Sequence, residues 1–414
     1  MEKFAFLFPG QGAQFIKMGE FFYDSNLIAR ETYKEASKVL GFEVDNLCFR
    51  GSYSAINDFL NMQIAIVTTE LAIFRTYKHD FGIEPQFFIG HSIGEYAALT
   101  AAGAIEFKDT LRILKKRGEL VKRIIDQELG YMTVVEHVDA QTITKLIQEA
   151  KLEKEVFISC KNTKKQFAIS GTMKGMDTIE RMLVDNNAVI SPLISSPPMH
   201  SPVMESIRQE FYEFLKTITY YPFRAPIISN VTGMAFSDPE RIPELMADQL
   251  VNPVQFSKSL QLLYDFGVGV CIEMGPKRLL SEFVSAENNK IQNYCYGVKG
   301  HRDELRALIE SDEHFAFDTP NFLGNCLAIL AATENRNTNS EEFSKVQMLY
   351  KKIRKAYQSD ETVSDSDCEA VFRDVINALK IKKLERQEIK SWIKMLLDNT
   401  NTYYQYQSIY EEIG

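Results

Sequence analysis

The clearest potential for chemistry in this sequence lies in residues 90–94, Gly-His-Ser-Ile-Gly. An apolar run, residues 87–89, precedes them, and a segment with the composition of a helix start, residues 95–99, follows them. A serine between two glycines at a turn from strand to helix is the pattern of a nucleophile elbow, because only glycine leaves room for the crowded backbone around the raised serine. The pattern is short and common, so an ordinary loop is the other interpretation of Ser92 at this point.

The best candidate for a base that could activate Ser92 is His200. It lies in residues 195–202, Ser-Ser-Pro-Pro-Met-His-Ser-Pro, where three prolines restrict the backbone and interrupt regular strand pairing. We therefore expect a loop that holds His200 in a fixed place. Of the other five histidines, His91 is inside the elbow and four lie in ordinary polar contexts.

Three further segments could contribute to a binding site, or they could have a purely structural role. The glycines on either side of Gln11 could bring backbone N–H donors close to another group, or they could form a plain turn after a strand. Gln63 lies in an apolar helical segment, where a glutamine is more often a satisfied core residue than a ligand. Arg117 precedes a glycine within a helical pattern, and such a glycine, which costs about 1 kcal/mol relative to alanine, indicates a packing or functional reason.

The composition is that of an ordinary globular protein, and a length of 414 residues suggests two or three structural units. The net charge of −9 argues against a general nucleic-acid-binding protein, which would carry a basic face. No stretch approaches the roughly 18 apolar residues of a membrane span, and the apolar run at residues 4–8 is too short for a signal peptide. The six cysteines form no C-x-x-C pair, so we expect a reduced, cytoplasmic protein with no metal site.

The elements that must position these residues form an α/β main body, which we expect over residues 1–129 and 194–298. Hydrophobic runs predict strands at 4–8, 227–229 and 269–273, in addition to the apolar run before the elbow. The run at 269–273 is expected to be the last strand of the main body. Helical patterns cover residues 55–75, 97–102, 107–125 and 203–217.

Residues 130–193 have a different character and are expected to form an inserted subdomain. Strands are predicted at 131–135, 156–160, 166–170 and 188–191, and helices at 140–150 and 173–184. The resulting order, β-α-β-β-α-β, is typical of a ferredoxin-like unit.

Residues 299–414 are expected to form a helical C-terminal extension. Within residues 341–357, apolar side chains recur at spacings of three and four, which places them on one face of a helix. Similar stripes follow near residues 371–379 and 389–396. The apolar faces could pack onto the main body or bind a partner, and nothing in this segment indicates chemistry.

Seven short segments together match one known pattern in order and spacing. They are residues 8–14, 90–95, 117–118, 199–202, 229–233, 248–254 and 273–276. On these segments, residues 1 to about 298 resemble the malonyl-CoA:acyl carrier protein transacylases. The resemblance implies an α/β-hydrolase-like large subdomain with a parallel sheet and an inserted ferredoxin-like small subdomain. The extension has no counterpart in compact members of the family, and longer proteins of this type resemble free-standing acyltransferases that serve polyketide synthases.

The resemblance also implies a role for each candidate residue in a transfer of malonyl through an acyl-serine. Ser92 would attack the thioester and His200 would act as the base. The backbone N–H groups of Gln11 and Ile93 would form an oxyanion hole, and the backbone carbonyl of Gln249 would orient the histidine.

Substrate recognition in this family is implied for four residues. Arg117 would bind the malonyl carboxylate, because a planar guanidinium makes a bidentate, charge-assisted pair with a carboxylate. His91, Gln63 and Met199 would line the pocket, and Met199 stands where malonyl-specific members often carry phenylalanine. No cofactor is implied, since the partners are malonyl-CoA and the phosphopantetheine thiol of an acyl carrier protein, in fatty acid or polyketide synthesis.

Three other functions compete with malonyl transfer at this point. An acyl hydrolase that clears carrier proteins would share the serine and the base but would gain nothing from a buried arginine. A general esterase of the α/β-hydrolase type usually has its histidine late in the chain, after an acidic residue. A non-enzymatic scaffold that docks carrier proteins would have no use for the nucleophile, the base and the anion-binding residue.

Overall fold

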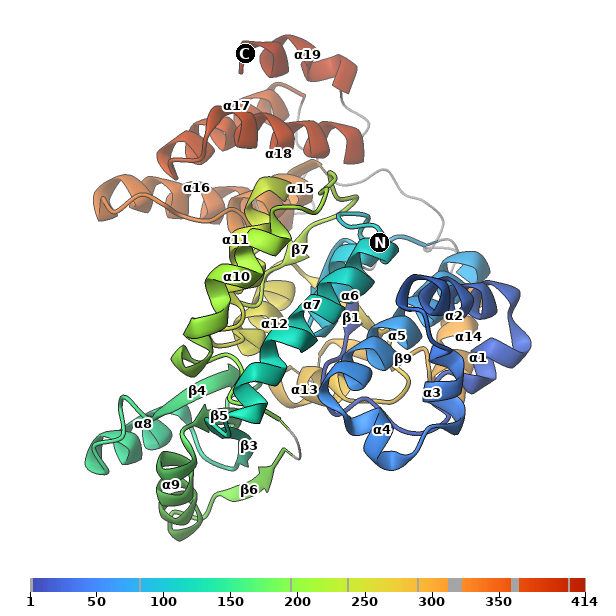
Figure 1. Cartoon of the computed structure of the whole chain (residues 1–414). Helices are drawn as coiled ribbons and strands as arrows, with labels where there is room; N and C mark the ends of the chain where they lie inside the picture. The colour runs from blue at the N-terminus through green and yellow to red at the C-terminus, as the bar shows by residue number, and fades with distance from the viewer. Residues whose placement is uncertain are drawn as a thin grey trace.

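Two separate β-sheets organise the chain. The computed structural model describes residues 3–81, 83–193, 196–236, 238–288, 290–311, 322–358, 365–400 and 403–413. Figure 1 shows the smaller sheet and its helices at one end of the molecule and the last helices of the chain at the other end, with the larger sheet between them.

The larger sheet is parallel throughout, with the strand order β7-β2-β1-β8-β9. Its strands are β1 (Lys3–Phe8), β2 (Phe87–Gly90), β7 (Ile227–Ile228), β8 (Val268–Glu273) and β9 (Gln292–Cys295). Strands β1 and β2 are continuous apolar runs and are almost completely buried, as is typical of a parallel sheet covered by helices. Phe8 pairs with Gly90, so these two strands end side by side at the same edge of the sheet.

Helices from both halves of the main body surround this sheet. The first half contains α1 (Glu20–Ser25), α2 (Leu27–Leu40), α3 (Val44–Arg50), α4 (Tyr53–Asn57), α5 (Phe59–Phe81), α6 (Gly94–Ala101) and α7 (Phe107–Asp126). The second half contains α10 (Glu205–Leu215), α11 (Ile242–Asp248), α12 (Phe256–Asp265) and α13 (Leu280–Glu287), with short 3-10 turns at Pro202–Met204 and Pro239–Arg241. Helix α14 (Lys299–Ser311) follows β9 and is the first helix of the predicted extension. None of the helices in the described ranges is long and apolar enough to cross a membrane.

The smaller sheet is antiparallel, with the order β4-β5-β3-β6. Its elements are β3 (Tyr131–Glu136), α8 (Ala140–Glu149), β4 (Val156–Lys161), β5 (Gln166–Gly171), α9 (Met173–Asp185) and β6 (Val189–Pro192). The two helices pack on this sheet around a small apolar core of their own, which includes Ile143, Ile169 and Ile179. This is the predicted ferredoxin-like arrangement.

The C-terminal extension is helical and contacts the main body. Its helices after α14 are α15 (Phe322–Ala332), α16 (Ser340–Gln358), α17 (Asp365–Ile381), α18 (Arg386–Asn399) and α19 (Tyr403–Glu412). Apolar residues of the extension belong to the same continuous core as the main sheet. Polar contacts add to this packing, since the Lys3 ammonium lies 5.0 Å from the ring centroid of Tyr357 and Arg241 forms an ion pair with Glu334.

The predicted fold class is confirmed. No element was predicted for residues 20–50, where α1, α2 and α3 lie, and two further elements differ from the structure. The helix expected over residues 55–75 is two helices, because Asp58 leaves the helical conformation and its carboxylate accepts hydrogen bonds from the first N–H groups of α5. The strand at 269–273 is not the last of the sheet, since β9 adds an edge strand beyond β8. The boundaries predicted between the main body, the inserted subdomain and the extension stay a prediction. Residues 194 and 195, at the boundary where the subdomain ends, lie outside the described ranges.

The turn between β2 and α6 is held against the end of β1 at close range. A Cβ atom at Gly94 would lie 2.1 Å from the carbonyl oxygen of Phe8 and 2.3 Å from that of Pro9. Both obstacles are backbone atoms of the neighbouring strand end, so neither can rotate away. The glycine therefore allows the turn to approach the segment that follows β1.

We expect the substitution Gly94→Ala to lower the free energy of unfolding by about 3 kcal/mol, because the added methyl group forces the two backbone segments apart. Urea unfolding followed by circular dichroism measures this loss. Gly300→Ala is the matched control, since a Cβ at that helical position meets no atom within 4 Å and should leave stability unchanged or slightly raised. Equal stability of the two variants would contradict the close approach.

Candidate active site

Ser92 lies at the tip of the turn that joins β2 to α6. Its φ angle is 53°, in the left-handed region that non-glycine residues rarely adopt. Hydrogen bonds from Gly94 N to His91 O at 3.0 Å and from Glu95 N to Ser92 O at 3.1 Å close the turn. A strained serine between a strand and a helix is the geometry that the glycine spacing predicted.

His200 meets Ser92 across 108 residues of sequence. The serine Oγ lies 2.7 Å from His200 Nε2, and His200 Nδ1 lies 2.6 Å from the backbone oxygen of Gln249. A carbonyl oxygen only accepts, so Nδ1 carries the proton and Nε2 is left to accept from the serine hydroxyl. His200 also has a left-handed φ, 59°. The structure therefore brings Ser92, His200 and Gln249 together as a chain of hydrogen bonds.

The surroundings of His200 keep its imidazole neutral. Burial lowers the pKa of His200 to about 3, the hydrogen bond to Gln249 acts in the opposite direction, and the positive charge of Arg117 lowers the pKa further. A neutral imidazole is the form that accepts a proton. Arg117 contacts the helix that follows the elbow, since its guanidinium lies against the ring of Tyr96 on α6.

Two backbone N–H groups beside Ser92 have no acceptor among the described residues. They belong to Gln11, in the loop after β1, and to Ile93, in the elbow. The two loops lie against each other, since a Cβ at Gly10 would come 2.5 Å from the oxygen of His91. The Gln11 side chain points to the segment before His200, where its Oε1 accepts from Ser196 Oγ at 3.2 Å. Two unpaired donors next to a nucleophile are what an oxyanion hole requires.

Arg117 is a buried cation on α7, with 2% of its surface exposed. Its Nη1 donates to Gln63 Oε1, which is itself fully buried, and the guanidinium lies 5.6 Å from the ring centroid of Tyr96. Burial lowers the pKa of Arg117. Its Nε has no hydrogen-bond partner and no carboxylate of the described residues forms an ion pair with it. A buried positive charge without a counter-ion is costly unless an anionic ligand binds it.

His91 and Met199 each directly precede one member of the Ser92–His200 pair in the sequence. The Nε2 atom of His91 lies 2.8 Å from Asn162 Oδ1, in the loop after β4, and the ring packs on Phe256 at 5.2 Å between centroids. Burial lowers the pKa of His91. Met199 directly precedes His200 and is buried, and its carbonyl accepts from Ser170 Oγ at 3.1 Å. His91 therefore links the elbow to the smaller sheet and makes no bond to His200.

Sequence reasoning missed three polar residues that hold this site. Asn162 is one, and the others are Asn230 and Glu95, which are both buried. Asn230 Oδ1 accepts from Ser92 N at 2.6 Å, and its Nδ2 donates to Gly90 O at 2.6 Å. Burial raises the pKa of the Glu95 carboxyl to about 8, and the bonds that it accepts from Asn230 and Gln249 act in the opposite direction. Both residues lie within segments that match the family pattern, which was the only signal for them.

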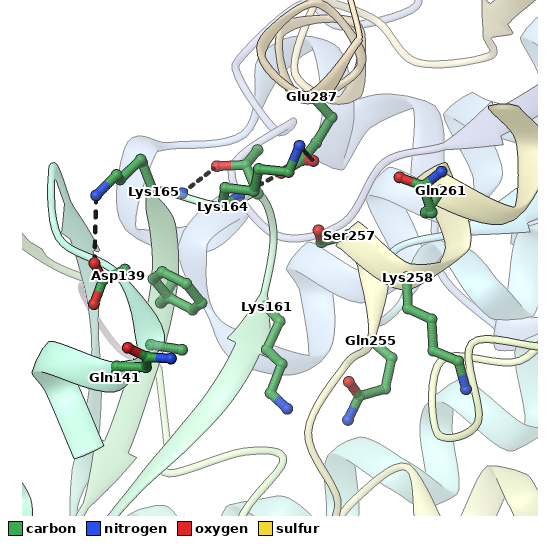
Figure 2. Close-up of a pocket in the computed structure, with 13 residues that line it drawn as sticks. Asp139, Gln141, Lys161, Lys164, Lys165, Gln255, Ser257, Lys258, Gln261 and Glu287 are labelled. Carbon is green, nitrogen blue, oxygen red and sulfur yellow. Dashed lines mark hydrogen bonds and ion pairs between the residues drawn. The ribbon is translucent and has the colours of Figure 1, made fainter. Parts of the chain in front are cut away.

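A separate cavity of about 690 Å3 lies between α8, the turn after β4 and the start of α12. Figure 2 shows Lys161 and Lys258 on facing elements of this cavity. Lys165 forms an ion pair with Asp139 at 3.5 Å and Lys164 with Glu287 at 3.8 Å. Ser92, His200 and Arg117 do not line this cavity, and within the described ranges no cluster of three His, Cys, Asp or Glu side chains could hold a metal ion.

Comparison with known proteins agrees with this geometry. Residues 5–295 match the model of the acyl transferase domain. A malonyl CoA-acyl carrier protein transacylase of Bacillus subtilis is 30% identical over 364 residues, 86% of this chain and 91% of that protein, so the similarity includes part of the chain after residue 298. Another, from Bacillus subtilis strain 168, is 35% identical over 297 residues, 70% of this chain and 92% of that protein.

Solved structures give the same result. The malonyl CoA-acyl carrier protein transacylase from Coxiella burnetii superposes with a TM-score of 0.71 at 26% identity, covering 73% of this chain and 96% of that one. A malonyl-transacylase in complex with a type II polyketide synthase acyl-carrier protein has a TM-score of 0.71 at 27% identity and covers 75% of this chain and 100% of that one. The chain therefore belongs to the malonyl-CoA:acyl carrier protein transacylase family of acyl transferase domains.

Proposed function

We propose that this protein transfers a malonyl group from malonyl-CoA to the phosphopantetheine thiol of an acyl carrier protein. The observation that carries the proposal is the buried guanidinium of Arg117, which lies near the Ser–His pair and has no carboxylate partner in the described residues. A neutral acyl chain would leave this charge unpaired, whereas the free carboxylate of a malonyl group would neutralise it.

In the first half of the proposed reaction, His200 Nε2 takes the proton from Ser92 Oγ as the oxygen attacks the thioester carbonyl. The negative charge that develops on the carbonyl oxygen is stabilised by the N–H groups of Gln11 and Ile93. Collapse of the tetrahedral intermediate breaks the C–S bond, and His200 returns the proton to the departing sulfur of CoA. The product is malonyl-Ser92.

In the second half, the same groups act in reverse order with a new thiol. The carrier's phosphopantetheine thiol gives its proton to His200 and attacks the ester carbonyl, and the proton then returns to Ser92 as the C–O bond breaks. Support for a carrier as the acceptor comes from the solved relative that is a complex of a malonyl-transacylase with a polyketide synthase carrier. The proposal includes carriers of fatty acid and of polyketide synthesis, and this complex supports the polyketide type.

Mass spectrometry of the intact protein tests the proposal. Wild type incubated with malonyl-CoA should gain the mass of one malonyl group, and Ser92→Ala should gain none, because among the described residues Ser92 is the serine that is paired with the base. A phosphopantetheinylated carrier protein added to the loaded enzyme should then carry the malonyl group. Malonate released into water in place of a malonylated carrier would support the acyl hydrolase, and labelling of Ser92→Ala would remove Ser92 from the mechanism.

Substitution of Arg117 tests the choice of acyl group. We expect Arg117→Ala to lower kcat/KM for malonyl-CoA roughly a hundredfold, because about 3 kcal/mol is lost when the substrate carboxylate is buried without a partner. Loading from acetyl-CoA should not fall. The measurement is steady-state transfer with each substrate, and Arg123→Ala, an exposed arginine on the same helix, is the matched control. Equal loss with both substrates would contradict the carboxylate-binding role.

The pH dependence of loading tests the state of the base. Because burial lowers the pKa of His200 to about 3, the imidazole stays neutral, and therefore active as a base, well below the pH at which an ordinary histidine is protonated. We expect kcat/KM for malonyl-CoA to stay level from pH 8 down to about pH 5 and to fall only in more acidic solution. A half-loss near pH 6.5 would show that His200 titrates as an ordinary histidine in the free enzyme.

A further inference from the structure

Glu95 is a buried carboxyl that touches neither Ser92 Oγ nor His200. It lies in the first turn of α6, with 1% of its surface exposed. One of its oxygens, Oε1, accepts from the backbone N–H of Asn230 at 2.8 Å, and the other, Oε2, accepts from the side-chain nitrogen of Gln249. Each oxygen thus holds a residue from a different part of the second half of the main body.

Gln249 connects this carboxyl to the base. Its backbone carbonyl accepts from His200 Nδ1, while its side-chain Nε2 donates to both Glu95 Oε2 and the Ser92 carbonyl, the latter at 2.9 Å. The orientation of the amide follows from its neighbours, because both are acceptors and only the NH2 group can bond to them. Glu95 therefore anchors the residue whose carbonyl sets the direction of the imidazole.

Asn230 connects the same carboxyl to the nucleophile. Its backbone is tied to Glu95, and its side chain accepts from Ser92 N and donates to Gly90 O. These two bonds bridge the residues on either side of His91 and so fix the elbow from the side of β7. A single carboxyl thereby holds both supports, one for the serine and one for the histidine.

We propose that Glu95 is a positioning residue. It does the work of the acid in a catalytic triad, but it acts on the histidine through Gln249 and does not contact the histidine itself. In a Ser-His-Asp triad the carboxylate bonds directly to histidine Nδ1. Here a peptide carbonyl occupies that position, and the carboxyl of Glu95 fixes the carbonyl through the Gln249 side chain. The inference rests on the proposed function and deepens it, because the acylation of Ser92 is what Glu95 would support.

Glu95→Gln isolates this role with little change in shape. Above about pH 8, where the Glu95 carboxyl is ionised, both of its oxygens accept. The new side chain has one acceptor and one NH2 group, so at pH 9, where the comparison is made, its NH2 must face a donor, either Asn230 N–H or the Gln249 amide. We expect the rate of Ser92 acylation to fall roughly tenfold to a hundredfold while KM for malonyl-CoA stays within about twofold, since the loss of one buried bond displaces the base without touching the substrate.

Glu70→Gln is the matched control. Glu70 is also fully buried on a helix of the main body, α5, and neither of its oxygens has a hydrogen-bond partner among the described residues. Burial raises its pKa well above the ordinary value, so the substitution replaces one neutral side chain by another of the same size. We expect Glu70→Gln to acylate at the wild-type rate.

The NMR signal of the His200 Nδ1 proton distinguishes a positioning role from a general loss of stability, because a general loss of stability would leave the chemical shift of this proton unchanged. In protein labelled with 15N-histidine, and with the signal identified by its loss in His200→Ala, the proton should appear hydrogen-bonded in wild type and in Glu70→Gln. In Glu95→Gln it should shift or exchange rapidly with solvent. A wild-type rate in Glu95→Gln overturns the inference, and so does a slower rate with an unchanged His200 signal.

Failure of the inference and failure of the proposed function are distinguishable. Absence of acylation in the wild type would contradict malonyl transfer, yet the His200 signal of the unliganded proteins would still test the role of Glu95. Should Glu95→Gln fail to fold, Gln249→Met takes its place, because it keeps the carbonyl at position 249 and removes only the side-chain donor. Gln249→Met should show the same slower acylation rate and the same altered His200 signal. A wild-type rate, or a slower rate with an unchanged signal, would overturn the inference.

Discussion

The parallel pairing of β1 with β2 is the constraint on which the rest of the site depends. Because Phe8 lies opposite Gly90, the segments that leave the two strands emerge together, and His91 N donates to Phe8 O at 2.9 Å across the gap. One segment carries the nucleophile and the other carries the Gln11 N–H group. A shift of this register by one residue would separate Ser92 from the N–H group of Gln11 and turn the side chains of the shifted strand to the opposite face of the sheet.

Around this edge the protein places a neutral imidazole and a buried cation in the same dry surroundings. Burial keeps the imidazole of His200 neutral and also lowers the pKa of Arg117, whose guanidinium carries its charge despite the burial. These two conditions support each other, because the cation disfavours protonation of the imidazole and the neutral imidazole adds no repulsion to the cation. Under the proposed function, the malonyl carboxylate would meet a cation close to an unprotonated base.

Local features of the site could be predicted from the sequence, and long-range ones could not. Ser92 and the loop at Gln11 are marked by glycine spacing, which reports backbone geometry within a few residues, and prolines mark His200 in the same way. Gln249 was expected only through family resemblance, because its functional atom is a backbone carbonyl, which every residue has. Glu95 bonds to residues 135 and 154 positions away, and no spacing in one sequence encodes such a contact.

The same distinction applies to the fold. Most buried strands and several long helices, α7 and α16 among them, were predicted, because each is a repeated pattern over many residues, whereas α2 was not. The break at Asp58 was missed, since it depends on one side chain that caps a helix, and β9 was missed, since a four-residue, half-polar edge strand has too little pattern to recognise.

Both members of the reactive pair have left-handed backbones, although neither is a glycine. Each conformation raises the energy of the folded state by on the order of 1 kcal/mol, and the surrounding bonds must offset it. A sequence selected for thermal robustness alone would carry glycine or asparagine at these two positions, and it would be inert. Six other non-glycine residues of the described ranges share this conformation, so strain alone does not mark the pair. If Ser92 and His200 act as proposed, stability and turnover compete at positions 92 and 200.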